Sequence, residues 1–431
     1  MSLGYAGPPS SMPLRILLAA IGSSGDVNPV LGLGKALKAR GHQVSLATNE
    51  IFEALVRESG LEFIELGTRR EAEAMMGDPR LWHRRRGFHC IVEGAILPNL
   101  PRLYRIIEER QGPRLVVAAT TLCLGARVAQ DRFGVPTATL NLQPSVFRSL
   151  VDNGTLGGLH MGPGMPKLVK KAVFWAIDTL YVERHVGRPL NRFRSGLGLA
   201  AVSGVFASYI HSPQLVLGLF PEWFAPVQPD WPGNTHLTGF ILEDAGGDAG
   251  AHAEADRFLD SGPAPVLVTP GSAAMDRTRF FGHLVEACRA VGARAMLVTN
   301  HPAQLPRTLT PGIQAFHYLP FSRVMPRCAV AVYHGGIGTL AQAVRAGVPH
   351  LVVANAHDQP DNGQRIERIG LGLALDEHRL SSRSATRALA ELVASGETRR
   401  RCRELAPRIR PEEARLAACS RIEALAQQEP A

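Results

Sequence analysis

Short apolar runs alternate with polar turns and amphipathic stretches along the first part of the chain. The run LRILLAAI begins at Leu14, and the stretch NPVLGLGKALKARG that follows places Val30, Leu33 and Leu37 on one helical face. Short apolar runs are typical of buried strands, and a spacing of three or four residues is typical of a helix packed on them. The order strand, helix, strand predicts a parallel sheet with helices on both faces.

The alternation continues, stops and then resumes. Further strands are expected in the first part over residues 43–48, 61–66, 114–120 and 136–142. From roughly 71 to 110 and from roughly 145 to 215 the pattern is helical or irregular. A second strand series is expected over residues 265–272, 293–299, 313–319, 329–339, 349–355 and 371–376. The pattern predicts an α/β protein with two Rossmann-like, doubly wound parallel-sheet domains.

The stretch from 221 to 256 is rich in Pro, Gly, Asp and Ala and indicates the domain junction. We therefore expect the following division: a disordered leader over 1–13, an N-terminal domain over 14–235, a linker over 236–262, a C-terminal domain over 263–405 and a C-terminal helix over 406–431. The length of 431 residues, of which 45% are apolar, agrees with two cores.

Composition bears on the cellular compartment and the partners of the protein. The six cysteines follow no metal-ligand or disulfide spacing, and no stretch has the pattern of a signal peptide or a spanning helix, so a cytoplasmic protein is expected. Lys and Arg exceed Asp and Glu by nine, partly in Arg-rich pieces at 83–87 and 397–405. This excess fits nucleic acid, an anionic membrane face or an anionic substrate, and equally well a set of basic solvated helices.

A glycine turn in AVAVYHGGIGTLAQAVRAG joins an expected strand to an expected helix. Glycines at such a turn let the backbone approach a phosphate, and the free amides and dipole of the helix start stabilise its charge. We expect a diphosphate at Gly336, Gly338 and Thr339, with a hydrogen bond from His334. Glycine turns also occur in doubly wound sheets without a phosphate, so an ordinary turn is the alternative.

Two neighbouring loops carry further polar groups at the same sheet edge. Asp358 and Gln359 follow the next expected strand, where a carboxylate beside an amide suits sugar hydroxyls. Ser272, at the end of the first strand of the second series, adds a hydroxyl for the diphosphate. Turn formation is the alternative for both loops. The chain has no D-x-D motif or convincing metal-ligand cluster, so neither a metal nor another cofactor is expected.

The first loop, AIGSSGDVNP, places Asp26 among glycines and serines after the first strand. Asn28 suits the cap of the following helix and Pro29 its first position. Asp26 is then not needed as a cap, which leaves it for chemistry.

At this point the motifs resemble those of a known family. GSSGDVNPVLGLGKALKARGHQVSLAT and HGGIGTLAQAVRAGVPHLVVANAHDQPDN are similar to the paired motifs of the inverting, nucleotide-sugar-dependent glycosyltransferases of the GT-B fold, families 1 and 28. That group includes antibiotic, sterol and plant glycosyltransferases. MGDPRLW (76–82) and HSPQLVLGLFPEWFAPVQPDWP (211–232) more narrowly resemble the rhamnosyltransferases of bacterial rhamnolipid biosynthesis, with similarity from about 14 to 405.

The resemblance implies a role for each donor-side residue. The diphosphate contacts would be His334, Gly336, Gly338, Thr339 and Ser272, the sugar contacts Asp358 and Gln359, and the nucleobase neighbours Tyr318 and Leu319. Gln342 occupies a position where many UDP-sugar enzymes of the plant branch carry a glutamate for both ribose hydroxyls, which weakly favours a deoxyribose nucleotide such as dTDP. Asp26 matches the first-loop aspartate that serves as catalytic base in part of the family.

The middle insertions would form the acceptor site. Met76, Trp82 and Phe88 would line an apolar cavity, and Arg84 to Arg86 would meet an acceptor carboxylate, although ordinary core or surface positions are the alternative. The resemblance implies transfer of L-rhamnose from dTDP-L-rhamnose to a 3-(3-hydroxyalkanoyloxy)alkanoate, giving a mono-rhamnolipid.

Three alternatives stay open. The first is the same fold using UDP-glucose or another dTDP-sugar on a polyketide, sterol or other lipophilic alcohol. The second is a non-catalytic nucleotide-sugar-binding module. The third, an NAD enzyme, is disfavoured because GSSGD is not G-x-G-x-x-G. The expected partners are the donor and a lipophilic hydroxy-acid acceptor but no nucleic acid, together with peripheral contact with the inner membrane or an acceptor-synthesising enzyme.

Overall fold

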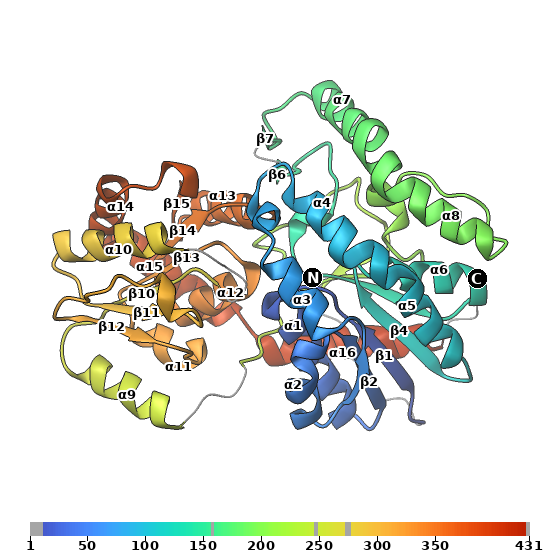
Figure 1. The fold of residues 1–431 in the computed structure, drawn as a ribbon, viewed down its shortest axis with the longest axis horizontal. Helices are drawn as coiled ribbons and strands as arrows, with labels where there is room; N and C mark the ends of the chain where they lie inside the picture. Colours follow the sequence, from blue (N-terminus) through green and yellow to red (C-terminus); the bar gives the residue numbers. More distant parts are fainter. Residues whose placement is uncertain (1–11, 157–158, 245–248, 272–276, 428–431) are drawn as a thin grey trace.

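Two parallel sheets organise the chain, one in each half (Figure 1). The computed structural model describes residues 12–156, 159–244, 249–271 and 277–427, so most of the expected leader lies outside the described residues. The N-terminal sheet has the strand order β3-β2-β1-β4-β5-β8-β9, and the C-terminal sheet has the order β12-β11-β10-β13-β14-β15. Every pair of neighbouring strands in both sheets is parallel. The predicted fold class of two Rossmann-like domains is confirmed.

The strands of the first sheet are β1 (Arg15–Ala19), β2 (Gln43–Thr48), β3 (Glu62–Glu65), β4 (Leu115–Thr120), β5 (Thr137–Asn141), β8 (Leu215–Gly218) and β9 (Thr235–Leu237). Those of the second are β10 (Val266–Thr269), β11 (Ala295–Val298), β12 (Ile313–Phe316), β13 (Val330–Tyr333), β14 (His350–Ala354) and β15 (Gly372–Asp376). A small antiparallel pair joins β6 (Thr155–Leu156) to β7 (Leu159–His160).

Helices cover both faces of each sheet (Figure 1). The N-terminal domain contains α1 (Ser24–Ala39), α2 (Glu53–Glu58), α3 (Arg69–Met76), α4 (Gly87–Ile91), α5 (Leu97–Glu109), α6 (Leu124–Phe133), α7 (Lys167–Ile177) and α8 (Arg188–Gly196). The second half contains α9 (Ala249–Asp260), α10 (Thr278–Ala290), α11 (Phe321–Val324), α12 (Ile337–Ala346), α13 (Gln359–Ile369), α14 (Ser382–Ala394), α15 (Gly396–Leu405) and α16 (Pro411–Leu425).

Side chains of β1 show how one strand serves two cores. Successive side chains of a strand point to opposite faces of the sheet. Ile16 and Leu18 pack in the cluster that contains Leu33 of α1, whereas Leu17 packs in the cluster that contains Leu103 of α5. An unbroken apolar run is therefore required, because β1 is buried on both faces.

The strand order reverses at one place in each sheet. β1 lies between β2 and β4, and β10 lies between β11 and β13. In doubly wound folds, ligands bind beyond the carboxyl ends of strands at such a reversal. The loops that follow β1, β10 and β13 are among those in which the sequence predicted functional residues.

The start of α1 differs from the prediction. Ser23, not Asn28, is the N-cap, and Pro29 lies inside the helix. Asp26 completes a capping box, because its Oδ2 atom accepts a hydrogen bond from the Ser23 backbone amide at 2.8 Å. The expectation that Asp26 has no capping role is wrong.

The predicted linker over 236–262 contains regular structure at both ends. β9 adds the last strand to the N-terminal sheet, and α9 packs on the C-terminal domain, where the ring centroids of Phe258 and Phe316 are 6.0 Å apart. β9 has only three residues, which is too short for a periodicity to reveal. The Ala-rich sequence of α9 suits a helix, although its Gly and Asp content suggested a loop.

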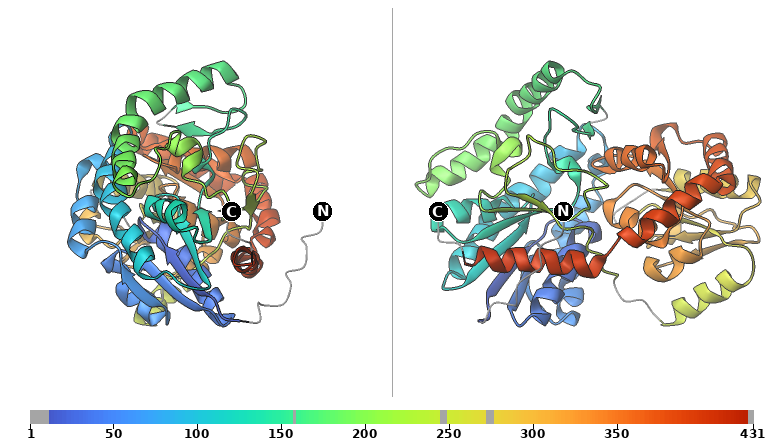
Figure 2. Two further views of the ribbon diagram at one scale, coloured as in Figure 1. Left: turned by 90° about the vertical axis from the view of Figure 1, so that its right-hand side faces the viewer. Right: turned by 180° about the vertical axis from the view of Figure 1, so that it is seen from behind.

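The C-terminal helix α16 returns to the N-terminal domain (Figure 2). It packs against α1, and its residues Ala418, Cys419 and Ile422 belong to the N-terminal core. Glu423 accepts hydrogen bonds from Arg40 at 2.6 and 2.7 Å and lies 2.8 Å from His42 Nε2. Burial alone raises the pKa of Glu423, but the hydrogen bonds from Arg40 and His42 outweigh it and hold that pKa below its ordinary value.

We expect Glu423→Ala to lower the free energy of unfolding by about 3 kcal/mol, because it leaves Arg40 and His42 partly buried without their partner. Urea unfolding followed by circular dichroism measures the change. Glu413→Ala on the same helix is the matched control, because its ion pair with Arg410 is exposed, and it should change stability by less than about 0.5 kcal/mol. Equal effects of the two substitutions would contradict the proposed role of Glu423.

Candidate active site

The N-termini of α1 and α12 meet at the boundary between the domains. A Cβ atom built on Gly338 would lie 3.9 Å from the Cα atom of Gly25. Each helix follows the carboxyl end of a strand at which the strand order reverses. The two predicted half-sites, one in each domain, are therefore brought together.

Asp26 faces this boundary from the N-terminal side. Its Oδ2 atom is held by the Ser23 amide and lies 3.2 Å from the Ser23 hydroxyl. Its Oδ1 atom accepts no hydrogen bond from any residue that the structure describes. Burial raises the pKa of Asp26 above its ordinary value, although the hydrogen bonds from Ser23 lower it. The carboxylate thus caps a helix with one oxygen and leaves the other for a proton.

Asp358 faces the same space from the C-terminal side, as the N-cap of α13. Burial, together with the nearby charge of Asp26, raises the pKa of Asp358 to about 7. Asn362 donates one hydrogen bond to Asp358 Oδ2 at 2.7 Å and another to the Gly335 carbonyl at 2.9 Å. This amide fixes the carboxyl group against the glycine turn that precedes α12.

The start of α12 has the features expected of a phosphate site. Gly336 is its N-cap and has no side chain to cap it, so the amides of Ile337, Gly338 and Thr339 lack intrahelical partners. Gly335 has a φ of +98°, and a Cβ atom there would lie 3.1 Å from the Gln359 backbone carbonyl oxygen. Only glycine allows this close turn.

His334 stands beside the same amides. Its ring is so close to Gly271 and Gly336 that a Cβ atom on either would lie 2.5 Å or less from it. Burial lowers the pKa of His334 to about 4, helped by the charge of Arg277. Its Nδ1 atom is buried and has no partner among the described residues. A neutral imidazole with an unused ring nitrogen is thus available at the expected diphosphate position.

Gln342 lies one turn further along α12 and contacts a residue that the sequence did not single out. Its Nε2 atom donates to Asp244 Oδ1 at 2.8 Å. A carboxylate oxygen only accepts, so the amide must turn its NH₂ group toward Asp244. The carbonyl oxygen of Gln342 is left buried without a described partner. Asp244 lies in the domain connection, where no motif signals a function.

Tyr318 and Leu319 differ in their surroundings. Burial raises the pKa of Tyr318 to about 12, with a further contribution from the charge of Asp244, which places its hydroxyl near the Asp244–Gln342 pair. The Leu319 side chain belongs to the hydrophobic core of the C-terminal domain. Leu319 therefore has only its main chain available for a base.

Gln359 and Ser272 are the remaining residues predicted for the donor side. The side-chain carbonyl of Gln359 accepts hydrogen bonds from the Asn355 and Ala356 amides at 2.9 and 3.2 Å, so it shapes the loop. Its amide nitrogen has no hydrogen-bond partner among the residues that the structure describes. Ser272 lies outside the described residues.

Trp82 lies at the domain boundary, and Phe88 lies in the insertion. The Trp82 ring is 5.3 Å from the Arg277 guanidinium carbon and 5.5 Å from the His357 ring, both in the C-terminal domain. Phe88 packs on Phe206 and Tyr181 at 5.3 and 6.2 Å. These two side chains therefore face different elements.

Met76 and the basic run complete the acceptor-side prediction. Met76 ends α3 half-buried. Arg84, which was expected to meet an acceptor carboxylate, pairs instead with Asp376 at 2.5 Å and donates to the Asn355 carbonyl at 3.3 Å. It ties the N-terminal insertion to the donor-side loops. Arg85 and Arg86 are exposed.

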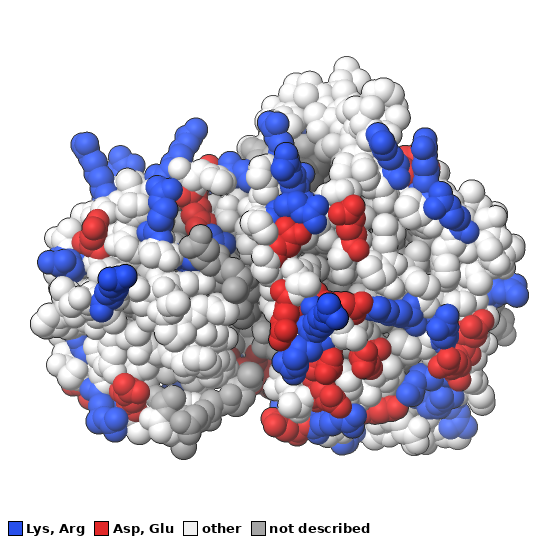
Figure 3. Space-filling view, in the orientation of Figure 1, with Lys and Arg blue, Asp and Glu red and all other residues white. Residues whose placement is uncertain are grey.

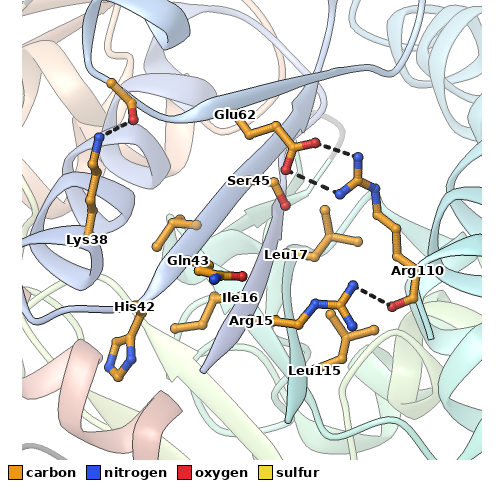
Figure 4. Close-up of a pocket in the computed structure, with 12 residues that line it drawn as sticks. Arg15, Ile16, Leu17, Lys38, His42, Gln43, Ser45, Glu62, Arg110 and Leu115 are labelled. Atoms are coloured by element: carbon orange, nitrogen blue, oxygen red, sulfur yellow. Dashed lines mark hydrogen bonds and ion pairs between the residues drawn. The ribbon is translucent and has the colours of Figure 1, made fainter. Parts of the chain in front are cut away.

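A separate hollow of about 500 Å³ opens at the opposite edge of the N-terminal sheet, beside the first residues of β1, β2 and β4 (Figure 4). Its cationic side chains already have partners within the protein. Arg110 binds Glu62, Arg15 donates to the Arg110 carbonyl, and Lys38 donates to the Gly60 carbonyl. This hollow lies at the amino ends of these strands, whereas Asp26 follows the carboxyl end of β1.

Over the described ranges of the chain, no group of three or more His, Cys, Asp or Glu side chains is arranged to hold a metal ion.

We expect Asp358→Asn to melt several degrees above the wild type at pH 8. In a domain of this size, about 1 kcal/mol of unfolding free energy corresponds to 2–4 °C in melting temperature. A carboxyl with a pKa raised from 3.8 to about 7 binds more protons in the folded than in the unfolded chain over that interval. Stability is therefore lost as the pH rises through it. The neutral amide removes this loss.

Scanning calorimetry from pH 5 to pH 8 should show the advantage of Asp358→Asn shrinking as the pH is lowered. Asp260→Asn, at an exposed ion pair with Arg327, is the control and should show no such trend. If the difference in melting temperature between Asp358→Asn and the wild type did not change with pH, the titration would belong to another group.

Comparison with protein families gives a match in each half of the chain. Residues 16–94 match the glycosyltransferase family 28 N-terminal domain, and residues 286–419 match the C-terminal domain of the erythromycin biosynthesis protein CIII-like family. O-mycaminosyltylonolide 6-deoxyallosyltransferase of Streptomyces fradiae is 32% identical over 370 residues, which cover 83% of this chain and 84% of that protein. 4'-Demethylrebeccamycin synthase of Lentzea aerocolonigenes is 27% identical over 401 residues, which cover 89% and 92%.

Solved structures agree on the fold. The glycosyltransferase of kitacinnamycin has a TM-score of 0.72 at 21% identity and covers 96% of this chain and 99% of its own. Spinosyn rhamnosyltransferase SpnG complexed with thymidine diphosphate has a TM-score of 0.66 at 19% identity, with 94% and 99% covered. With both domain models and a relative that is 32% identical over 83% of the chain, the chain belongs to the GT-B-fold glycosyltransferases related to families 1 and 28.

Proposed function

We propose that the protein is an inverting glycosyltransferase that moves L-rhamnose from dTDP-L-rhamnose to the hydroxyl of a 3-(3-hydroxyalkanoyloxy)alkanoate, forming a mono-rhamnolipid. The observation that carries the reaction is the meeting of two carboxyl groups with an uncapped helix N-terminus at the domain boundary. Asp26 comes from one domain, and Asp358 and the start of α12 come from the other. In this proposal Asp26 removes the acceptor proton, Asp358 holds the sugar and the start of α12 binds the diphosphate.

The acceptor oxygen attacks C1 of the sugar from the face opposite the diphosphate. The bond between C1 and the diphosphate oxygen breaks, and dTDP leaves with the bonding electrons. The proton of the acceptor hydroxyl passes to Asp26 Oδ1, whose raised pKa makes it a stronger base than an exposed aspartate. The α12 amides and His334 stabilise the charge that develops on the diphosphate, while Asp358 and Gln359 hold the sugar.

The choice of a thymidine nucleotide is supported by the Asp244–Gln342 pair. Because Asp244 holds the amide NH₂ group, Gln342 presents one buried acceptor oxygen to the nucleoside. One acceptor suits the single ring hydroxyl of a deoxyribose better than the two hydroxyls of a ribose. The names of two similar proteins support a deoxysugar donor as well, since one is a 6-deoxyallosyltransferase and the other a rhamnosyltransferase bound to thymidine diphosphate.

The acceptor rests on the resemblance of residues 76–82 and 211–232 to the rhamnolipid enzymes. The second candidate is the same chemistry on a polyketide or another lipophilic alcohol, which the name of the tylonolide-modifying relative favours. Both candidates share the donor site and differ in the insertions that hold the acceptor.

We expect the purified protein to consume dTDP-L-rhamnose in preference to UDP-glucose and to add one rhamnose to the hydroxy-fatty-acid ester, as mass spectrometry of the lipid product would show. Gln342→Glu places a second carboxylate beside Asp244 and should lower the ratio of kcat/KM for the dTDP-sugar over the UDP-sugar about tenfold, or about 1.4 kcal/mol. Gln111→Glu, in an exposed loop, should leave the ratio unchanged.

Consumption of UDP-glucose alone would overturn the rhamnosyl assignment. Transfer from dTDP-L-rhamnose to a polyketide alcohol but not to the fatty-acid ester would favour the second candidate. Binding of nucleotide sugar without turnover on any acceptor would favour a non-catalytic module.

We expect Asp26→Asn to lower kcat by about 10²- to 10⁴-fold, the range for loss of a general base. Asparagine keeps an oxygen that accepts from the Ser23 amide, so α1 remains capped and the dissociation constant for the donor should hardly change. Calorimetric titration with dTDP measures binding, and product formation measures turnover. Ser23→Ala, which removes only the cap hydroxyl, should retain turnover. Wild-type turnover in Asp26→Asn would remove Asp26 from the reaction.

A further inference from the structure

A continuous helical arm projects from the N-terminal domain. It consists of α7, the π-helical segment Asp178–Gly187 and α8. Its α7 end lies beyond both sheets, as two orientations of the molecule show (Figures 1 and 2). Lys170 anchors α7 on its inner side, where the buried ammonium group donates to the Val151 carbonyl at 2.6 Å.

The outer side of α7 and the start of the π-helical segment carry large apolar side chains in solvent. Leu168, Trp175 and Leu180 are 79%, 66% and 71% exposed. Leu168, Ala172 and Trp175 are spaced by four and three residues, so they lie on one helical stripe opposite Lys170. Of the exposed large apolar side chains in the described part of the chain, more than half lie between residues 159 and 180. Single exposed apolar residues are ordinary, but a group on one projecting element indicates an interaction surface.

Basic side chains accompany this stripe. Residues 167–196 contain seven Lys or Arg and two acidic residues, and one of the acids, Asp178, is already paired with Arg148 at 2.6 Å. Lys167 and Lys171 are exposed on α7. Arg184, Arg188 and Arg192 are exposed at intervals of four residues along the rest of the arm.

Apolar and basic side chains occupy different parts of one face of the arm. On the face drawn in Figure 3, the surface that projects at α7 carries no charged side chains, and Lys and Arg side chains gather lower on the arm. An apolar tip with basic flanks is the arrangement of helices that lie in the interface of a bilayer, with Leu and Trp at the boundary of headgroups and acyl chains. Lys and Arg then contact anionic headgroups.

We propose that the helical arm docks on the surface of a bilayer that contains anionic lipids. Leu168, Trp175 and Leu180 enter the headgroup region, and the basic side chains bind lipid phosphates. The excess of exposed basic side chains favours an anionic surface over a second copy of this chain, which would bring the same positive arm against itself. The contact is peripheral, since no helix in the described ranges is long and apolar enough to cross a membrane.

The test is cosedimentation of the full-length protein with vesicles of phosphatidylcholine and phosphatidylglycerol at 7:3, compared with vesicles of phosphatidylcholine alone. We expect binding to the anionic vesicles that weakens in 0.5 M NaCl. The triple variant Leu168→Ser, Trp175→Ser, Leu180→Ser should reduce the bound fraction at least tenfold. The double variant Lys167→Glu, Lys171→Glu should reduce binding to the anionic vesicles and leave binding to the phosphatidylcholine vesicles unchanged. Leu416→Ser, at a side chain 48% exposed on α16, is the control and should bind as the wild type.

Circular dichroism and dTDP binding establish that each variant is folded, so loss of vesicle binding is not a loss of structure. Equal binding of the wild type and the triple variant would overturn the proposal. Absence of wild-type binding to anionic vesicles would overturn it too. Light scattering provides a further check: a dimer that the triple variant converts to a monomer, without vesicle binding, would assign the face to a second copy.

Discussion

The approach of Asp26 and Asp358 across the domain boundary is the constraint around which the rest of the molecule is arranged. When two carboxyl groups are buried near each other, each opposes the ionisation of the other. The pKa of Asp358 is accordingly raised to about 7 by burial and by the nearby charge of Asp26. The structure tolerates this because two helix N-termini and the Asn362 amide face the same space. A site that holds a diphosphate and removes a proton needs both kinds of group, positive dipoles for one and a basic oxygen for the other.

Contacts from the N-terminal insertion reach the donor side. Trp82 lies against Arg277 and His357, and Arg84 pairs with Asp376. The insertion therefore does more than shape an acceptor site, because it also holds the loops that follow β14 and β15. The N-terminal insertion and the loops of the C-terminal domain are thus linked through Trp82 and Arg84.

The sheets were predictable because many of their strands are apolar runs bounded by glycine or proline, as β10 over Val266–Thr269 illustrates. β9 was not, since three residues show no periodicity. His334, Gly336 and Asp358 marked from their residue types the loops that the structure brings to the domain boundary, and their roles stay predictions. Two contacts lay beyond the reach of sequence: the capping box of Asp26, which depends on where α1 starts, and Asp244, which meets Gln342 across 98 residues of chain. The family resemblance supplied residue roles but not these contacts.

The return of α16 to the N-terminal domain means that the chain passes between the domains twice, before α9 and again before α16. A single tether would leave the domains free to twist and separate in any direction. The two crossings lie side by side, because Arg415 donates to the Leu242 carbonyl at 3.1 Å and lies 3.8 Å from the Glu243 carboxylate. Any turn of one domain against the other therefore bends both segments of chain at one place, the junction where Arg415 meets residues 242 and 243.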